Sequence, residues 1–202
     1  VQDGVVTTLK VGEAVITATT TDGTDLSASC TVTVKPILVS SVTLDKQTAE
    51  VLRGETVTLI ATVLPADADN TTLVWTSSDE TVATVQNGVV TTLKAGEAVI
   101  TATTTDDSDL SASCTVTVKP ILVSSLTLDK QTAEVLRGEK VTLSATVSPA
   151  DADNTTLVWT SSDETVATVQ DGVVTTLKVG EAVITVTTTD GSDLSASCTV
   201  TV

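Results

Sequence analysis

The chain repeats itself with a period of 84 residues. The segment VQDGVVTTLK at Val1 returns as VQNGVVTTLK at Val85 and again as VQDGVVTTLK at Val169. This spacing divides the chain into two full units, residues 35–118 and 119–202, preceded by the last part of another unit, residues 1–34. A fixed period of this kind is typical of proteins that stack copies of one structural unit, so the fold of one unit determines the fold of the chain.

The two full units are nearly identical in sequence. They differ at eight of 84 positions: Val42/Leu126, Thr56/Lys140, Ile60/Ser144, Leu64/Ser148, Asn87/Asp171, Ala95/Val179, Ala102/Val186 and Asp107/Gly191. Because so few positions change, we expect both units to share one fold.

Each unit is predicted to consist of short β-strands. Apolar residues alternate with Thr, Ser or charged residues, and no stretch has the apolar period of a helix. We interpret residues 56–63 as one strand, in which Val57, Leu59, Ala61 and Val63 share a face. Gly, Pro, Asn and Asp lie between such segments and favour turns. About seven strands per unit predict an all-β fold in which two sheets pack as a sandwich.

Residues 1–34 correspond to the last three strands of a unit and lack the first four, including the strand that carries Trp in each full unit. Three strands of this kind cannot bury a core of their own. We therefore expect the missing part to belong to a longer parent chain, of which this sequence is a segment. The alternative is that a second chain completes the sandwich.

The connections between units are short and contain Pro. They read Lys35-Pro36-Ile37-Leu38-Val39, and the same sequence recurs at residues 119–123. Pro restricts its own backbone and that of the preceding residue, and no Gly or Ser adds flexibility. We expect stiff joints and units arranged end to end. Ile37 and Leu38 are expected either to contact the neighbouring unit or to begin the first strand of their own unit.

The sequence also carries a family resemblance. The segments TLDKQTAEVLRGETVTL, ATVLPADADNTTLVWTSSDETVATV, NGVVTTLKAGEAVITATTTD and SASCTVTV resemble the bacterial immunoglobulin-like group 2 family. This module occurs in tandem in bacterial surface proteins, intimin- and invasin-like adhesins and phage virion proteins. The resemblance covers each full unit and implies tandem immunoglobulin-like sandwiches in an extracellular location, on a cell or virion surface. It implies a stalk, spacer or adhesive module, and it supplies no catalytic or binding residues.

Composition argues against several classes of function. The chain has no His, the commonest general base, and a formal net charge of -16. Such an acidic surface repels nucleic-acid phosphates and anionic membranes. No apolar run is long enough to cross a membrane as a helix. We therefore expect no enzyme, no catalytic or cofactor-binding residues, no nucleic-acid partner and no membrane insertion in this segment.

Each unit contains one Cys: Cys30, Cys114 and Cys198. Equivalent positions in a linear array lie much farther apart than the ~7 Å between Cα atoms that a disulfide allows. We expect three buried free thiols, with an interchain bridge as the alternative. A nucleophilic role is not expected, because no His is present to activate a thiolate.

Each full unit contains one Trp, Trp75 or Trp159, in the middle of a predicted strand. A single Trp in this position is expected to fill the core of the sandwich. The surface then has no aromatic residue of the kind that anchors tight binding interfaces or stacks on sugars.

Acidic residues cluster in two loops of the second unit. Asp67 and Asp69 lie beside Asn70, and Asp106 and Asp107 lie close to Asp109. These side chains offer the oxygen ligands that calcium prefers. The third unit replaces Asp107 by Gly191, however, so the second cluster is not maintained. We expect solvated turns and no metal site, with calcium at the acidic loops or at the unit junctions as the alternative.

Two functions fit the sequence. The first is a structural spacer, stalk or fibre shaft, whose partners are neighbouring repeats of the same chain and, in a filament, other copies. The second is an adhesive module of a surface adhesin or virion protein that contacts a host receptor or polysaccharide. A diversified binder is expected to vary in its loops, whereas residues 65–70 are identical to residues 149–154. This identity favours the spacer.

Overall fold

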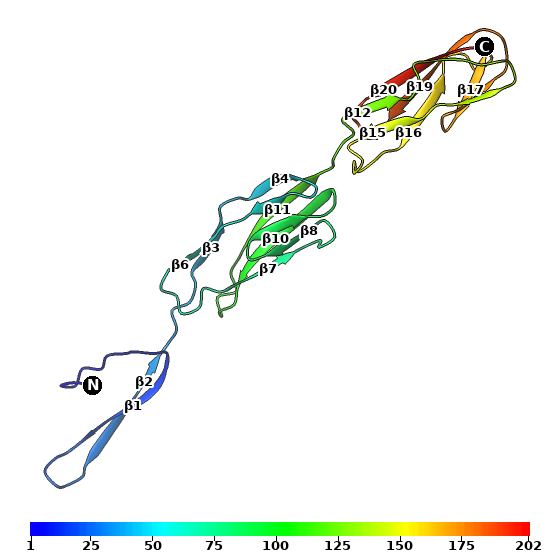
Figure 1. Cartoon of the computed structure of the whole chain (residues 1–202). Coiled ribbons are helices and arrows are strands. Elements are labelled where there is room, and N and C mark those ends of the chain that lie inside the picture. The colour runs from blue at the N-terminus through cyan, green and yellow to red at the C-terminus, as the bar shows by residue number, and fades with distance from the viewer.

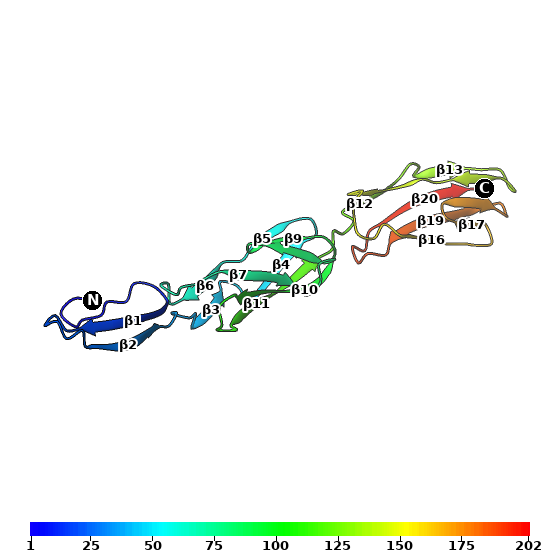
Figure 2. The same ribbon diagram turned by 90° about the horizontal axis from the view of Figure 1, so that it is seen from below.

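In the computed structural model, which describes all 202 residues, every regular element is a β-strand. The strands form three bodies in a row, with the N-terminus in the first and the C-terminus in the last (Figure 1 and Figure 2). The first body contains β1 and β2, the second β3–β11 and the third β12–β20. The predicted all-β class and the end-to-end arrangement are confirmed. No helix is present that could cross a membrane.

The second body is a sandwich of short sheets. Its strands are β3 (Ser41–Leu44), β4 (Thr48–Leu52), β5 (Thr56–Thr58), β6 (Ala61–Leu64), β7 (Leu73–Ser77), β8 (Ala83–Gln86), β9 (Val89–Thr92), β10 (Gly96–Thr104) and β11 (Ser111–Lys119). One sheet has the order β4-β11-β10-β7, a second has the order β5-β9-β8, and β3 pairs with β6. Strand β4 runs parallel to β11, whereas all other pairs are antiparallel.

The single strand predicted for residues 56–63 is wrong. The chain leaves β5 after Thr58 and enters β6 at Ala61, so that β5 pairs with β9 and β6 pairs with β3. The two residues at the break bind elsewhere: the backbone N of Leu59 donates to Gly88 O at 2.8 Å, and that of Ile60 donates to Asp45 Oδ1 at 2.7 Å. These hydrogen bonds hold the chain where it crosses from the sheet that contains β5 to the sheet that contains β6.

The hairpin between β8 and β9 follows from its two turn residues. Asn87 and Gly88 have φ values of 51° and 80°, the left-handed conformation that a tight two-residue hairpin turn requires. The turn sets Gln86 opposite Val89 and Val85 opposite Val90. Val90 is thereby placed in the core with no exposed surface.

The core lies between the two larger sheets and is aliphatic. Ile100, Cys114 and Val116, from β10 and β11, are fully buried, as are Ala83 and Val90 from the facing sheet. The buried side chains recur at every second residue along β10 and β11, as the alternating pattern predicts.

The third body repeats this sandwich. Its strands are β12 (Ser125–Leu128), β13 (Thr132–Glu134), β14 (Lys140–Thr142), β15 (Ala145–Ser148), β16 (Leu157–Ser161), β17 (Ala167–Gln170), β18 (Val173–Thr176), β19 (Glu181–Thr188) and β20 (Ser195–Thr201). Its sheets have the orders β13-β20-β19-β16, β14-β18-β17 and β12-β15. The strand orders of the second and third bodies therefore match one for one.

The first body is a hairpin in which β1 (Gly12–Thr19) pairs with β2 (Ser27–Val34). Its register is that of the full units, because Ile16 faces Cys30 as Ile100 faces Cys114. The third strand predicted for residues 1–34 is not formed, and only an isolated bridge joins Gln2 and Val5. In a full unit the corresponding strand, β9, lies between β5 and β8. Residues 1–34 lack the counterpart of β5 and half of that of β8, so this segment has no complete partner strand.

Candidate functional site

No group of three or more His, Cys, Asp or Glu side chains converges in a way that could hold a metal ion. The acidic loops considered for calcium form no such group. Their carboxylates instead accept hydrogen bonds from the protein, as described below.

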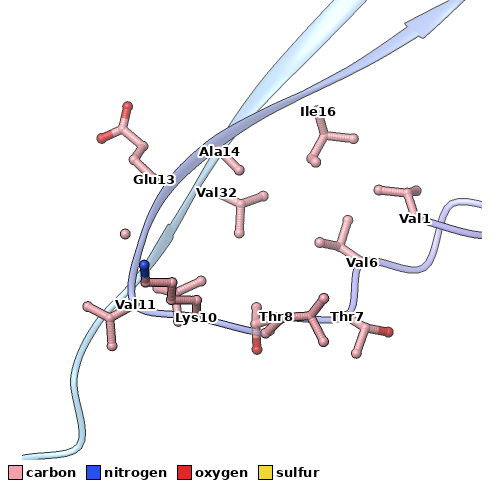
Figure 3. A pocket seen from close by; sticks show the side chains of 13 residues that line it. Val1, Val6, Thr7, Thr8, Lys10, Val11, Glu13, Ala14, Ile16 and Val32 are labelled. Carbon is pink, nitrogen blue, oxygen red and sulfur yellow. The ribbon is translucent and has the colours of Figure 1, made fainter. Parts of the chain in front are cut away.

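A hollow lined largely by apolar residues lies in the first body (Figure 3). Ala14, Ile16 and Val32 line it from the hairpin, and Val1 and Val6 line it from the opening segment. The counterparts of Ile16 and Val32 in the second unit are Ile100 and Val116, which are fully buried. The hollow thus corresponds to the open inner face of an incomplete sandwich.

The three cysteines are free, as expected, but they are not equally buried. Cys114 and Cys198 have no exposed surface, and burial raises the pKa of both thiols. The expectation of a buried thiol is wrong for Cys30, which is exposed. The reason is that no second sheet covers the face of β2 on which Cys30 lies.

Trp75 and Trp159 pack against the two cores, as predicted, and each is partly buried. The ring of Trp75 also lies close to the turn at Gly88. The two tryptophans are therefore part of the sandwich interior.

The loops that the sequence marks as acidic turns hold the connection between units. Asp69 Oδ2 accepts a hydrogen bond from the backbone N of Ile37, and Asp106 Oδ2 accepts one from that of Val39, both at 2.7 Å. In the third unit Asp153 and Asp190 bind Ile121 and Val123 in the same way, at 2.7 and 2.5 Å. Each connection is thus fastened to the unit that follows it by two carboxylates.

These hydrogen bonds stabilise the ionised carboxylates. The Ser192 hydroxyl and the backbone N–H of Val123 lower the pKa of Asp190 to about 2. The Ser108 hydroxyl and the N–H of Val39 lower the pKa of Asp106 in the same direction. These two aspartates remain ionised in all but strongly acidic solution.

The connection anchors itself through Val39 rather than through Ile37 and Leu38. Val39 is 4% exposed, whereas Ile37 and Leu38 are 48% and 40% exposed and lie before β3. Of the two alternatives for Ile37 and Leu38, the one in which they begin the first strand is therefore wrong. The corresponding Ile121, between two complete units, is partly buried.

The joint between the second and third units contains an ion pair that crosses from one unit to the other. Arg53 lies in the loop after β4, at the end of the second unit. Its Nε donates to Asp153 Oδ2 at 3.0 Å, and its Nη2 donates to the carbonyl oxygen of Asp151. The Asp151 carboxylate lies 3.8 Å from Nη2. Arg53 thus binds the acidic loop of the next unit at two residues.

Arg53 and Asp153 bind the backbone on either side of Pro120, at Lys119 and at Ile121. The backbone N of Arg53 donates to Lys119 O at 3.0 Å. Its side chain reaches Asp153, whose Oδ2 also accepts from the backbone N of Ile121. The N–H of Ile121 and the Arg53 guanidinium together hold the pKa of Asp153 below its usual value. The joint therefore consists of a restricted peptide segment braced by an ion pair.

The sequence alone did not assign Arg53 a partner. Its partner lies 100 residues away in the next unit. One available signal was that end-to-end stacking brings Arg53 of one unit towards an acidic loop of the next.

The model of the bacterial Ig-like domain (group 2) matches residues 38–116 and 122–200. The chain belongs to this family. The two matches cover most of the chain and correspond to the two complete sandwiches.

Two relatives have similar sequences over most of the chain. An uncharacterised protein of Clostridium acetobutylicum is 42% identical over 166 residues, which cover 81% of this chain and 17% of that protein. An Ig-like virion protein of Serratia phage KSP90 is 38% identical over 171 residues, covering 82% of this chain and 66% of that protein. The chain therefore spans only part of the length of both relatives.

Among solved structures, domains 4 and 5 of the S-layer protein SbsC align with a TM-score of 0.39 and 19% identity. The alignment covers 81% of this chain and 98% of that structure. The two family matches and the virion-protein relative support a structural or adhesive role.

Proposed function

We propose that this chain is a non-catalytic spacer segment of an extracellular bacterial or virion surface protein. In this role the repeats hold another part of the protein away from the surface that anchors it. The observation that carries the proposal is the joint between complete units, where a short Pro connection is braced by the Arg53 ion pair. A joint of this kind resists bending, and resistance to bending is what a spacer requires.

The distribution of sequence changes supports the same role. Ala102 and Val186 are fully buried, so this exchange alters the core. The loop at residues 65–70 is unchanged at residues 149–154. An identical loop is expected where the loop forms part of a repeated joint. It is not expected where the loop distinguishes ligands.

The relatives support a surface location. One relative is named as an Ig-like virion protein. The net charge of -16 favours solubility and opposes close lateral association of parallel copies. We propose that the segment lies outside the cell or on the virion, in a chain that contains further repeats.

The spacer proposal predicts that length scales with the number of repeats. A second copy of residues 119–202 placed directly after Val202 continues the 84-residue period. Each added unit is expected to increase the maximum dimension from small-angle X-ray scattering by a constant step of about 35 to 40 Å. A dimension that fails to rise in constant steps would contradict a stiff spacer.

The adhesive alternative is tested with the original chain and the lengthened chain. A spacer is expected to show no saturable binding to host cells or polysaccharide, whatever the number of units. Binding that saturates and increases with each added unit would instead assign the repeats an adhesive role.

A further inference from the structure

The two ends of a full unit carry complementary loops. One end carries the loop at residues 51–55, VLRGE, which recurs without change at residues 135–139. The other end carries the loop PADADN at residues 65–70 and 149–154. At the joint between the second and third units these two loops meet, because Arg53 binds Asp151 and Asp153.

The first loop forms the same turn in both units, although β4 continues to Leu52 whereas β13 ends at Glu134. Gly54 and Gly138 both have a φ of 88°, and Thr92 and Thr176 tie the two loops through matching hydrogen bonds from their hydroxyls. The Arg-bearing loop is therefore preformed in the third unit.

The two loops differ in their exposure to solvent. Leu52 is 46% exposed, whereas the corresponding Leu136 is 73% exposed. Arg53 is partly buried, whereas Arg137 is exposed and makes no ion pair. The third unit thus presents the same loop as the second without the acidic partner.

The acidic loop at residues 65–70 of the second unit likewise has no partner from another unit. Asp69 binds the backbone N of Ile37 as Asp153 binds that of Ile121. No basic side chain pairs with Asp67 or Asp69, whereas the corresponding Asp151 and Asp153 pair with Arg53. This loop is therefore already positioned by its own connection before an Arg reaches it.

We propose that the loop Leu136–Gly138 is a docking surface whose partner is the Pro-Ala-Asp-Ala-Asp loop of a following repeat unit of this sequence. Arg137 binds the two aspartates of that loop as Arg53 binds Asp151 and Asp153. The ion pair fixes the orientation of each unit relative to the next, so the array has one repeated joint geometry. The proposal goes beyond the spacer role, because a stiff spacer does not require every joint to have the same orientation.

The test uses the whole chain lengthened by a second copy of residues 119–202 directly after Val202. Cys30→Ser, Cys114→Ala and Cys198→Ala, with the same alanine at the counterpart of Cys198 in the added copy, remove all native thiols. Nitroxide labels are attached to Cys in place of exposed valines. One pair of labels replaces Val74 and Val158, and a second pair replaces Val158 and its counterpart in the added copy. Double electron–electron resonance then gives the distance distribution across each joint separately.

Arg53→Ala and Arg137→Ala serve as controls for each other. We expect Arg53→Ala to broaden only the distances between the second and third units, and Arg137→Ala to broaden only those between the third and added units. Unchanged distances across the added joint in Arg137→Ala would overturn the proposal. Unchanged distances in Arg53→Ala would also overturn the proposal, because they would show that the Arg53 ion pair does not fix the joint from which the proposal is argued.

Circular dichroism of both variants checks that the sandwiches remain folded. The outcome is separable from that of the spacer proposal. An array whose dimension rises in constant steps while both variants leave the joints unchanged would keep the spacer and reject the ion-pair docking.

Discussion

Arg53 and Asp153 belong to neighbouring repeats, and the Arg53 Nε atom lies 3.0 Å from Oδ2 of Asp153. Both side chains are 25% exposed, so the pair is neither free in solvent nor buried in a core. Pairs near the surface contribute about 0.2–1 kcal/mol and are weakened by salt. Such an energy is small for folding, but it is comparable with the thermal energy that bends a joint.

The first prediction concerns salt. At about 1 M salt the screening length falls to roughly 3 Å, so we expect the Arg53–Asp153 pair to weaken and the joint to bend more freely. Small-angle X-ray scattering between 0.1 M and 1 M NaCl is expected to show a wider range of conformations at high salt. The Arg53→Ala variant is the control, because its joint should be equally flexible at both concentrations. A wild-type curve that does not change with salt would assign the stiffness to Pro120 alone.

Much of the fold could be predicted from the sequence, because alternation reports directly on which side of a sheet a residue lies. The faces of β10 and β11 follow this pattern throughout. The break after Thr58 could not be predicted, since the alternation continues through it. The break depends on bonds from Leu59 to Gly88 and from Ile60 to Asp45, which are contacts between distant residues.

The joint was predicted only in part, for a related physical reason. The restricted connection is a local property, because Pro36 and Pro120 fix their own backbone. The role of Asp69 and Asp153 required knowledge of which backbone N–H groups they meet. A carboxylate in a turn looks the same in a sequence whether it faces solvent, calcium or a peptide group.

The second prediction concerns acid. The pKa of Asp190 is lowered to about 2 in the folded chain and is near 3.8 when the chain is unfolded, and Asp106 shifts in the same direction. A lowered folded pKa stabilises the protein above the unfolded value, and this contribution is lost as the pH falls through the folded value. We therefore expect stability to decline between about pH 4 and pH 2.

Urea unfolding of the chain followed by Trp fluorescence measures this decline. The double variant Asp106→Asn, Asp190→Asn is expected to be less stable at pH 7 and to lose less stability over the acidic range. A decline as steep as that of the unmodified chain would show that other carboxylates determine the acid sensitivity.

The third prediction concerns the thiols. Cys30 is exposed, whereas Cys114 and Cys198 are buried and have raised pKa values. The thiolate is the nucleophile that attacks a thiol reagent, so we expect one rapidly modified Cys per folded chain and three after denaturation. Mass spectrometry should locate the rapid modification at Cys30. Equal rates at all three positions would mean that the complete sandwiches open as readily as the hairpin.

A lengthened chain tests why Cys30 reacts. A copy of residues 35–84 placed directly before Val1 restores the strands that the first body lacks. In this chain Cys30 is expected to become as unreactive as Cys114. Continued rapid modification would show that the restored strands do not close over β2.

The fourth prediction compares two core positions with the same residue type. Ile100 is fully buried, whereas the corresponding Ile16 lies on the open face of the hairpin and is partly exposed. Ile100→Ala is expected to destabilise the second unit by about 2–5 kcal/mol, because it removes buried contacts and leaves a cavity. Ile16→Ala should leave the urea midpoint reported by the two tryptophans unchanged, because residues 1–34 form a separate body.

The last prediction concerns Gly88, which combines a constrained backbone with a crowded position. Its φ is 80°, and a Cβ atom there would lie 2.5 Å from the carbonyl oxygen of Leu59 and 3.2 Å from Cζ2 of Trp75. Gly54 is the matched control, because its φ is 88° but no atom lies within 4 Å of the corresponding Cβ position.

Gly54→Ala therefore introduces backbone strain alone, which costs about 1–2 kcal/mol. Gly88→Ala adds a steric clash with backbone that cannot move without breaking the Leu59–Gly88 hydrogen bond, so we expect a clearly larger loss. The Trp75 emission should also shift in Gly88→Ala and stay unchanged in Gly54→Ala, because only the first substitution displaces the indole ring. Equal losses of stability in the two variants would show that the close approach of Gly88 to Leu59 does not contribute to the fold.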